Sequence, residues 1–150
     1  MPGVTTAVDA APTKSKAAAQ SSSMVQFMVG GALLALTWCV FGQTLRHDFV
    51  NFDDYNYVAA NPAIRQGITG ESLLWVLTHT VSSNWHPVTM LSHLLDVQLF
   101  GLNASGHHLA SVLLHSGTVL LLFAFLNRAT HTVWRSVFVA ALFAIHPLRV

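Results

Sequence analysis

A run without any charged residue extends from Met24 to Leu45, and it constrains the fold more than any other feature of the chain. A helix of this length would measure about 33 Å, enough to cross a hydrocarbon core of about 30 Å. A cleaved signal peptide is the alternative, but its apolar core would be only about 7–15 residues long and would end in small residues. This run is longer and is followed by Arg46 and His47. We therefore predict an uncleaved membrane-spanning helix over residues 24–45.

The composition indicates that lipid is part of the solvent of this chain. Hydrophobic residues make up 53% of the 150 residues and charged residues 9%, whereas an ordinary soluble domain carries about 25% charged residues. The formal net charge of +1 offers no basic surface for nucleic acid, so we expect no nucleic-acid partner. Cys39 is the single cysteine of the sequence, which excludes a disulfide scaffold.

The rest of the chain divides into a tail, a long loop and two further apolar runs. Residues 1–23 are rich in Ala, Ser and Thr and predict a disordered cytoplasmic tail. Residues 108–126 carry no formal charge and predict a second span, in which His115 is expected to hydrogen-bond a neighbouring helix. Residues 136–150 predict the start of a third span, because the apolar part of this segment is too short to cross a bilayer alone. We therefore expect an all-α integral membrane fold that forms the front part of a longer multi-spanning protein.

Basic residues indicate the orientation of these spans. Two lysines precede the first span, and Arg128 and Arg135 lie in the link over residues 127–135. The positive-inside rule then places the N-terminus and this link in the cytoplasm. Residues 46–107 consequently form a loop on the external, non-cytoplasmic side.

The external loop is patterned for short helices. Thr69 is a candidate N-cap for a short helix over residues 73–77. Pro87 breaks the chain again, because proline disfavours helix at the residue before it. From Val88 to Phe100 apolar residues recur at helical spacing, which predicts an amphipathic helix that lies in the membrane interface.

Asp53 and Asp54 follow the first span closely and are the candidate chemical groups of this loop. One carboxylate can act as a general base while the other binds a divalent metal such as Mg²⁺ or Mn²⁺. A solvated Asp-Asp turn is the alternative, and the pair taken alone favours it. His146 would lie near the outer end of the third span, so it can share an external site with the two carboxylates.

Three of the nine histidines, His79, His86 and His93, are spaced by seven residues. On one helix they would share a face, but Pro87 makes a single helix unfavourable. A zinc site needs three or four converging ligands. The sequence contains no HExxH motif and no cysteine pair, so we do not predict zinc here.

Several short motifs occur in a fixed order along the chain. They include Asn51-Phe52-Asp53-Asp54, Asn84-Trp85-His86-Pro87-Val88-Thr89, Gly106-His107-His108-Leu109 and Ala141-Leu142-Phe143-Ala144-Ile145-His146-Pro147-Leu148. In this order and spacing the motifs resemble the N-terminal part of a family of bacterial membrane glycosyltransferases. Those proteins have a multi-spanning GT-C-type domain followed by tetratricopeptide repeats, and they are similar to the eukaryotic transmembrane and tetratricopeptide-repeat O-mannosyltransferases. The resemblance covers about residues 32–150.

The resemblance implies a GT-C-type fold in the bacterial plasma membrane. It also implies transfer of a sugar, with mannose as the family-level expectation, from a polyprenyl-phosphate donor to a hydroxyl group of a protein or glycan. Asp53 and Asp54 match the acidic position that acts at the acceptor, and the sequence does not rank them. Arg149 stands where the family pattern has histidine, and its guanidinium can still bind phosphate. The candidate contacts to phosphate or sugar are His86, His93, His107, His108, His146 and Arg149.

Two other classes of function stay open. A non-catalytic membrane scaffold or binding subunit would keep the helices without an active site. A transporter fragment is disfavoured, because the first two spans contain no Asp, Glu, Lys or Arg. Since a GT-C site is built where several helices converge, we expect residues 1–150 alone to be inactive as a transferase.

Overall fold

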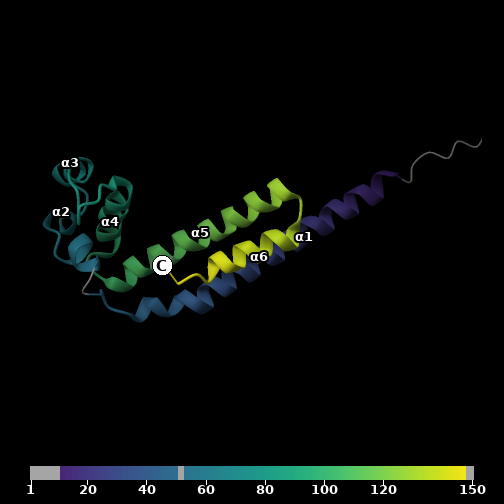
Figure 1. Ribbon diagram of the computed structural model, residues 1–150, viewed down its shortest axis with the longest axis horizontal. Helices are drawn as coiled ribbons and strands as arrows, with labels where there is room; N and C mark the ends of the chain where they lie inside the picture. The colour runs from purple at the N-terminus through teal and green to yellow at the C-terminus, as the bar shows by residue number, and fades with distance from the viewer. Residues whose placement is uncertain (1–10, 51–52, 148–150) are drawn as a thin grey trace, which may run out of the picture.

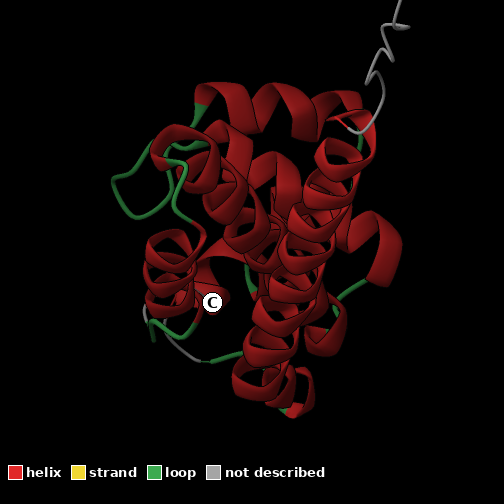
Figure 2. Cartoon of the chain, turned by 90° about the vertical axis from the view of Figure 1, so that its right-hand side faces the viewer, coloured by secondary structure: helices red, strands yellow, loops and turns green. Residues whose placement is uncertain are grey.

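The computed structural model describes residues 11–50 and 53–147, and for residues 11–22 only the course of the helix. Within these residues the chain forms helices joined by short loops and no strand (Figure 2). Three helices lie side by side along the molecule, and the other helices gather at one end (Figure 1). The lengthwise helices are α1 (Ala11–Phe41), α5 (Ala104–Thr130) and α6 (Val133–Ala144).

Two helical segments are long and apolar enough to cross a membrane, Ser23–Arg46 and Ala104–Thr130. They contain the runs over residues 24–45 and 108–126 that the sequence singles out, so the prediction of an all-α chain with two such helices is confirmed. The third apolar helix, α6, is shorter. These helices indicate a membrane location, whereas the orientation of the spans stays a prediction.

Two boundaries differ from those expected. α1 begins at Ala11, within the segment expected to be a disordered tail over residues 1–23, and the alanines of that segment are good helix formers. α5 continues to Thr130, so the turn to α6 is much shorter than the expected link over residues 127–135. His131 makes this turn in the left-handed conformation, with a φ of 53°.

Small residues allow α1, α5 and α6 to approach one another closely. Ala140 and Ala144 of α6 are fully buried against Leu33 of α1 and Val119 of α5, and such small side chains let helix backbones come together in a membrane. His115 donates from Nε2 to the carbonyl oxygen of Ala144 at 3.1 Å, which joins α5 to α6. The expectation that His115 bonds a neighbouring helix is therefore confirmed.

The segment over residues 55–100, which we call the cap, lies at one end of the molecule and packs on α5 through α4 (Figure 1). Its core contains buried residues from all of its helices, among them Ile64, Val76 and Leu94. The chain reaches the cap through a 3-10 turn, η1 (Gly42–Arg46). The helices of the cap are η2 (Tyr55–Ala59), α2 (Pro62–Arg65), α3 (Gly70–Thr78) and α4 (Pro87–Phe100).

The amphipathic helix predicted over Val88–Phe100 is present as α4, which starts one residue earlier at Pro87. It has two apolar faces. Met90, Leu94 and Val97 are buried in the core of the cap, while Val88, Leu95 and Leu99 are exposed. The expected position of α4 in the membrane interface stays a prediction, and the exposed face is the one that would meet lipid.

Thr69 caps α3 as the sequence predicts. Its Oγ1 accepts from the backbone N–H of Ser72 at 3.0 Å, and its own N–H donates to the Ser72 hydroxyl at 2.8 Å. We expect Thr69→Ala to weaken α3 by about 1 kcal/mol, because the helix loses an N-terminal acceptor. Hydrogen exchange of the α3 amides measures this loss. Thr80→Ala, at an exposed threonine outside the helices, is the matched control, and equal exchange in both variants would contradict the expectation.

Candidate functional site

The two adjacent carboxylates lie in a pocket at the junction of the cap with the long helices. The pocket has a volume of about 390 Å³ and is bounded by η1, the segment that follows it and the first turns of α5. Predicted site residues thus come together here from separate parts of the chain. The lining residues are Thr44, His47, Asp48, Val50, Asp53, Asp54, His108 and Ser111.

The structure distinguishes Asp53 from Asp54, which the sequence does not. Asp54 is half-buried, and its Oδ2 accepts from the backbone N–H of Val50 at 2.9 Å. Its charge also acts on His93. Asp53 is exposed. Asp54 is therefore held in place by the backbone, and Asp53 is the more accessible carboxylate of the pair.

Of the four predicted loop histidines, His86, His93 and His107 gather where α4 meets α5. The ring of His86 stacks on Tyr57 with centroids 5.2 Å apart. The rings of His93 and His107 lie 6.4 Å apart, and Phe49 contacts His107 edge-on at 5.2 Å. The structure therefore brings these three histidines together, while the neighbouring His108 lines the pocket.

His79 is not part of this group, although it is spaced by seven residues from His86. The break predicted at Pro87 explains this. α3 ends at Thr78 and α4 begins at Pro87, so His79 does not share a helix with His93. His79 instead stacks on Trp75 with ring centroids 5.1 Å apart.

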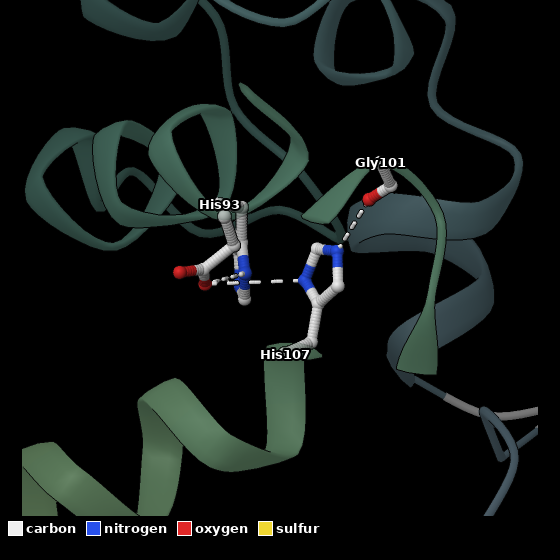
Figure 3. Close-up of polar contacts among 4 residues, drawn as sticks. His93, Gly101 and His107 are labelled. Atoms are coloured by element: carbon white, nitrogen blue, oxygen red, sulfur yellow. Dashed lines mark hydrogen bonds and ion pairs between the residues drawn. The ribbon is translucent and has the colours of Figure 1, made fainter. Parts of the chain in front are cut away.

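His107 is oriented by a backbone carbonyl. Its side chain is only 7% exposed, and its Nε2 donates to the oxygen of Gly101 at 3.0 Å. This bond turns Nδ1 toward α4, where it lies 3.9 Å from Oδ2 of Asp96. His93 Nδ1 also lies 3.9 Å from that oxygen. Dashed lines mark both contacts in Figure 3. Both distances exceed those of a hydrogen bond.

Burial sets the electrostatics of this group. It lowers the pKa of His93, an effect that nearby His107 and His86 increase and that Asp54 opposes. Burial also raises the pKa of Asp96, which His107 partly counteracts. Near neutral pH the ring of His93 is therefore uncharged and carries a lone pair.

Asp96 is the site residue that the sequence interpretation missed. The available signal was the spacing of His93 and Asp96, since residues three apart are neighbours on a helix surface. Their partner His107 comes from another helix. Its proximity depends on the angle between α4 and α5, which the spacing of residues does not determine.

The remaining predicted residues lie elsewhere. His146 follows α6, which ends at Ala144 beside His115. His115 is about 12 Å along α5 from His107, so a shared site of His146 with Asp53 and Asp54 stays a prediction. Arg149 lies outside the described residues, as does the Asn51-Phe52 part of the first motif.

No protein-family model and no solved structure matches the chain. A curated relative, protein O-mannosyl-transferase TMTC1 of Mus musculus, is 31% identical over 130 residues. The matched segment covers 78% of this chain but only 13% of that relative, so the chain spans a small part of the relative's length. Over that part, the similarity supports the resemblance to the transmembrane and tetratricopeptide-repeat O-mannosyltransferases.

Proposed function

We propose that this chain is part of a membrane glycosyltransferase with a GT-C-type fold. It moves a sugar, with mannose as the first choice, from a polyprenyl-phosphate donor to a hydroxyl group of a protein or glycan. The observation that carries the proposal is the pocket that gathers Asp53, Asp54 and His108 where two membrane-length helices end. The similarity to an O-mannosyl-transferase supports the same class of reaction.

The position of the pocket suits a reaction between a lipid and a water-soluble group. A polyprenyl donor reaches the junction from the bilayer, and an acceptor hydroxyl reaches it from water. Arg128 lies at the opposite end of α5 from the pocket. By the positive-inside rule this supports a pocket on the non-cytoplasmic side, with the N-terminus in the cytoplasm. The bacterial plasma membrane is the location that the motif resemblance implies.

The two carboxylates take different roles in the proposed reaction. Asp53 is the general base, which removes the proton from the acceptor hydroxyl as its oxygen attacks the sugar C1 and the polyprenyl phosphate leaves. Asp54, held by the N–H of Val50, orients that region of the pocket. His108 contacts the phosphate. Asp48 lines the same pocket, and these carboxylate oxygens suit a Mg²⁺ or Mn²⁺ ion, which would supply positive charge for the phosphate.

Sugar transfer by the full-length protein in membranes tests this assignment. We expect Asp53→Asn to lower kcat by about 100-fold to 10,000-fold, the usual contribution of a general base. Glu71→Gln, at an exposed residue of α3 outside the pocket, removes the same charge and serves as the control. The readout is transfer of labelled mannose from polyprenyl-phosphate mannose to an acceptor peptide.

The result also separates the proposal from its rival. Full transfer by Asp53→Asn would show that Asp53 is not the base. Full transfer by both Asp53→Asn and Asp54→Asn would remove these carboxylates from the proposed mechanism. Absence of transfer by the unchanged full-length protein would favour a non-catalytic scaffold. A scaffold would instead lose its partners when exposed apolar residues of the long helices, such as Phe138, are changed.

A further inference from the structure

We propose that His93, Asp96 and His107 bind a divalent transition-metal ion such as Zn²⁺ between α4 and α5. One ligand atom from each of the three side chains lies within 4.8 Å of the other two. The group consists of two imidazole nitrogens and a carboxylate oxygen. It is a different set of ligands from the carboxylates of the pocket, and it does not depend on the proposed transferase activity.

The ligand atoms have no other evident use among the described residues. Nδ1 of His93 and Nδ1 of His107 are buried and make no hydrogen bond there. Each lies 3.9 Å from Oδ2 of Asp96, which is too far for a hydrogen bond. Buried polar atoms without a partner are costly, so two of them facing one carboxylate oxygen indicate that something else binds there.

His107 is prepared as a ligand by its second nitrogen. Nε2 donates to the carbonyl oxygen of Gly101 at 3.0 Å, which leaves the lone pair on Nδ1 (Figure 3). Metal-binding histidines are held in this way by a hydrogen bond from the other ring nitrogen. The side chain of His107 is 7% exposed, so this orientation is fixed inside the protein.

The spacing of the ligands suits a metal with small adjustments. Ligand atoms bound to one tetrahedral ion lie roughly 3.4 Å apart when each bond is about 2.1 Å long. The two nitrogen–oxygen distances of 3.9 Å would therefore close by about half an ångström. The distance between the two nitrogens, which is within 4.8 Å, would close by at most about 1.4 Å. Two imidazoles and one carboxylate favour zinc and similar ions over Mg²⁺ or Ca²⁺, and three protein ligands leave a fourth position for water.

Such an ion would join the cap to a membrane-length helix. His93 and Asp96 belong to α4 of the cap, and His107 belongs to the first turn of α5. The next residue, His108, lines the pocket with Asp53 and Asp54. The ion would therefore fix the position of one wall of the pocket.

Metal binding by the purified protein in detergent tests the proposal. After chelator treatment, we expect one Zn²⁺ per chain by calorimetry, and visible absorption when Co²⁺ is used as the coloured probe. We expect His93→Gln and Asp96→Asn each to weaken binding at least 100-fold, since even loss of a residue behind a ligand costs 10–100-fold. His131→Asn, at the far end of α5, is the matched histidine control and should bind like the unchanged protein.

Further variants keep each outcome informative. Asp96→Glu preserves the carboxylate, and we expect it to keep binding within about 10-fold of the unchanged protein, which separates a ligand role from a folding role. Asp53→Asn should bind Zn²⁺ normally, so that failure of this site and failure of the transferase proposal are distinguishable. Absence of Zn²⁺ and Co²⁺ binding by the folded, unchanged protein would overturn the proposal. So would equal affinities of the unchanged protein, His93→Gln and Asp96→Asn.

Discussion

Gly106→Ala will force α5 away from the end of α4. A Cβ at this position would clash with both Cβ and Cγ of Phe100. Cβ of Phe100 cannot move without its backbone, so the last turn of α4 or the first turn of α5 must shift. Overpacking of this kind costs about 1–3 kcal/mol, and a clash with two carbons at once places the expected loss at the upper end. Because His107 is the next residue, we also expect its bond to Gly101 to break.

Hydrogen exchange of the α4 and α5 amides would measure this destabilisation. Gly117→Ala is a matched control, because Gly117 lies in the same helix and a Cβ there would meet nothing within 4 Å. That control should be neutral or stabilise α5 by up to about 1 kcal/mol, since alanine is the better helix former. If both alanine variants exchanged alike, the close packing of α5 on Phe100 would be disproved.

Leu94→Ala will unfold or loosen the cap while leaving the long helices in place. Leu94 is 0% exposed, at the centre of the cap core with Ile64 and Val76. Removing a fully buried leucine side chain costs about 2–5 kcal/mol, from lost apolar burial and from the cavity that remains. The cap has a small core, so this loss is a large share of its stability.

Protease cleavage in the loop between α3 and α4 would report on the cap. Ser82 and Ser83 adopt positive φ values of 50° and 66°, so this turn is held by the packing around it. We expect rapid cleavage there in Leu94→Ala. The control, Leu95→Ala, changes a neighbouring side chain that is 48% exposed, and it should cleave like the unchanged protein. Rapid cleavage in both would show that burial of Leu94 does not hold the cap together.

Local signals in the sequence are sufficient to predict several elements of this fold. The charge-free run after Met24 predicted a membrane-length helix, Thr69 predicted the start of α3, and Pro87 predicted the break before α4. Each of these depends on residues within one or two helical turns of one another. The residues at the start of α1 were misinterpreted because their composition resembles a disordered tail, although the alanines also favour helix.

The arrangement of the site was only partly accessible from the sequence. Asp53 and Asp54 were selected because two adjacent acids stand out in a chain with 9% charged residues. Asp96 did not stand out, since a single acid on an amphipathic helix is expected to face water. Its partnership with His107 depends on the turn between α4 and α5, where Gly101 has a φ of 64°. The sequence pattern does not determine that backbone angle.

The bond from His107 to Gly101 has a consequence for how motion of the cap would be detected. Gly101 combines a φ of 64° with a ψ of −139°, a conformation that is essentially restricted to glycine. Its carbonyl oxygen therefore points at the histidine only while the cap keeps one angle to α5. If the cap tilted, this acceptor would be lost and the ring proton would be free to move from Nε2 to Nδ1. The tautomer of a single imidazole would thus report the tilt of the cap, and NMR of the ring nitrogens could record it.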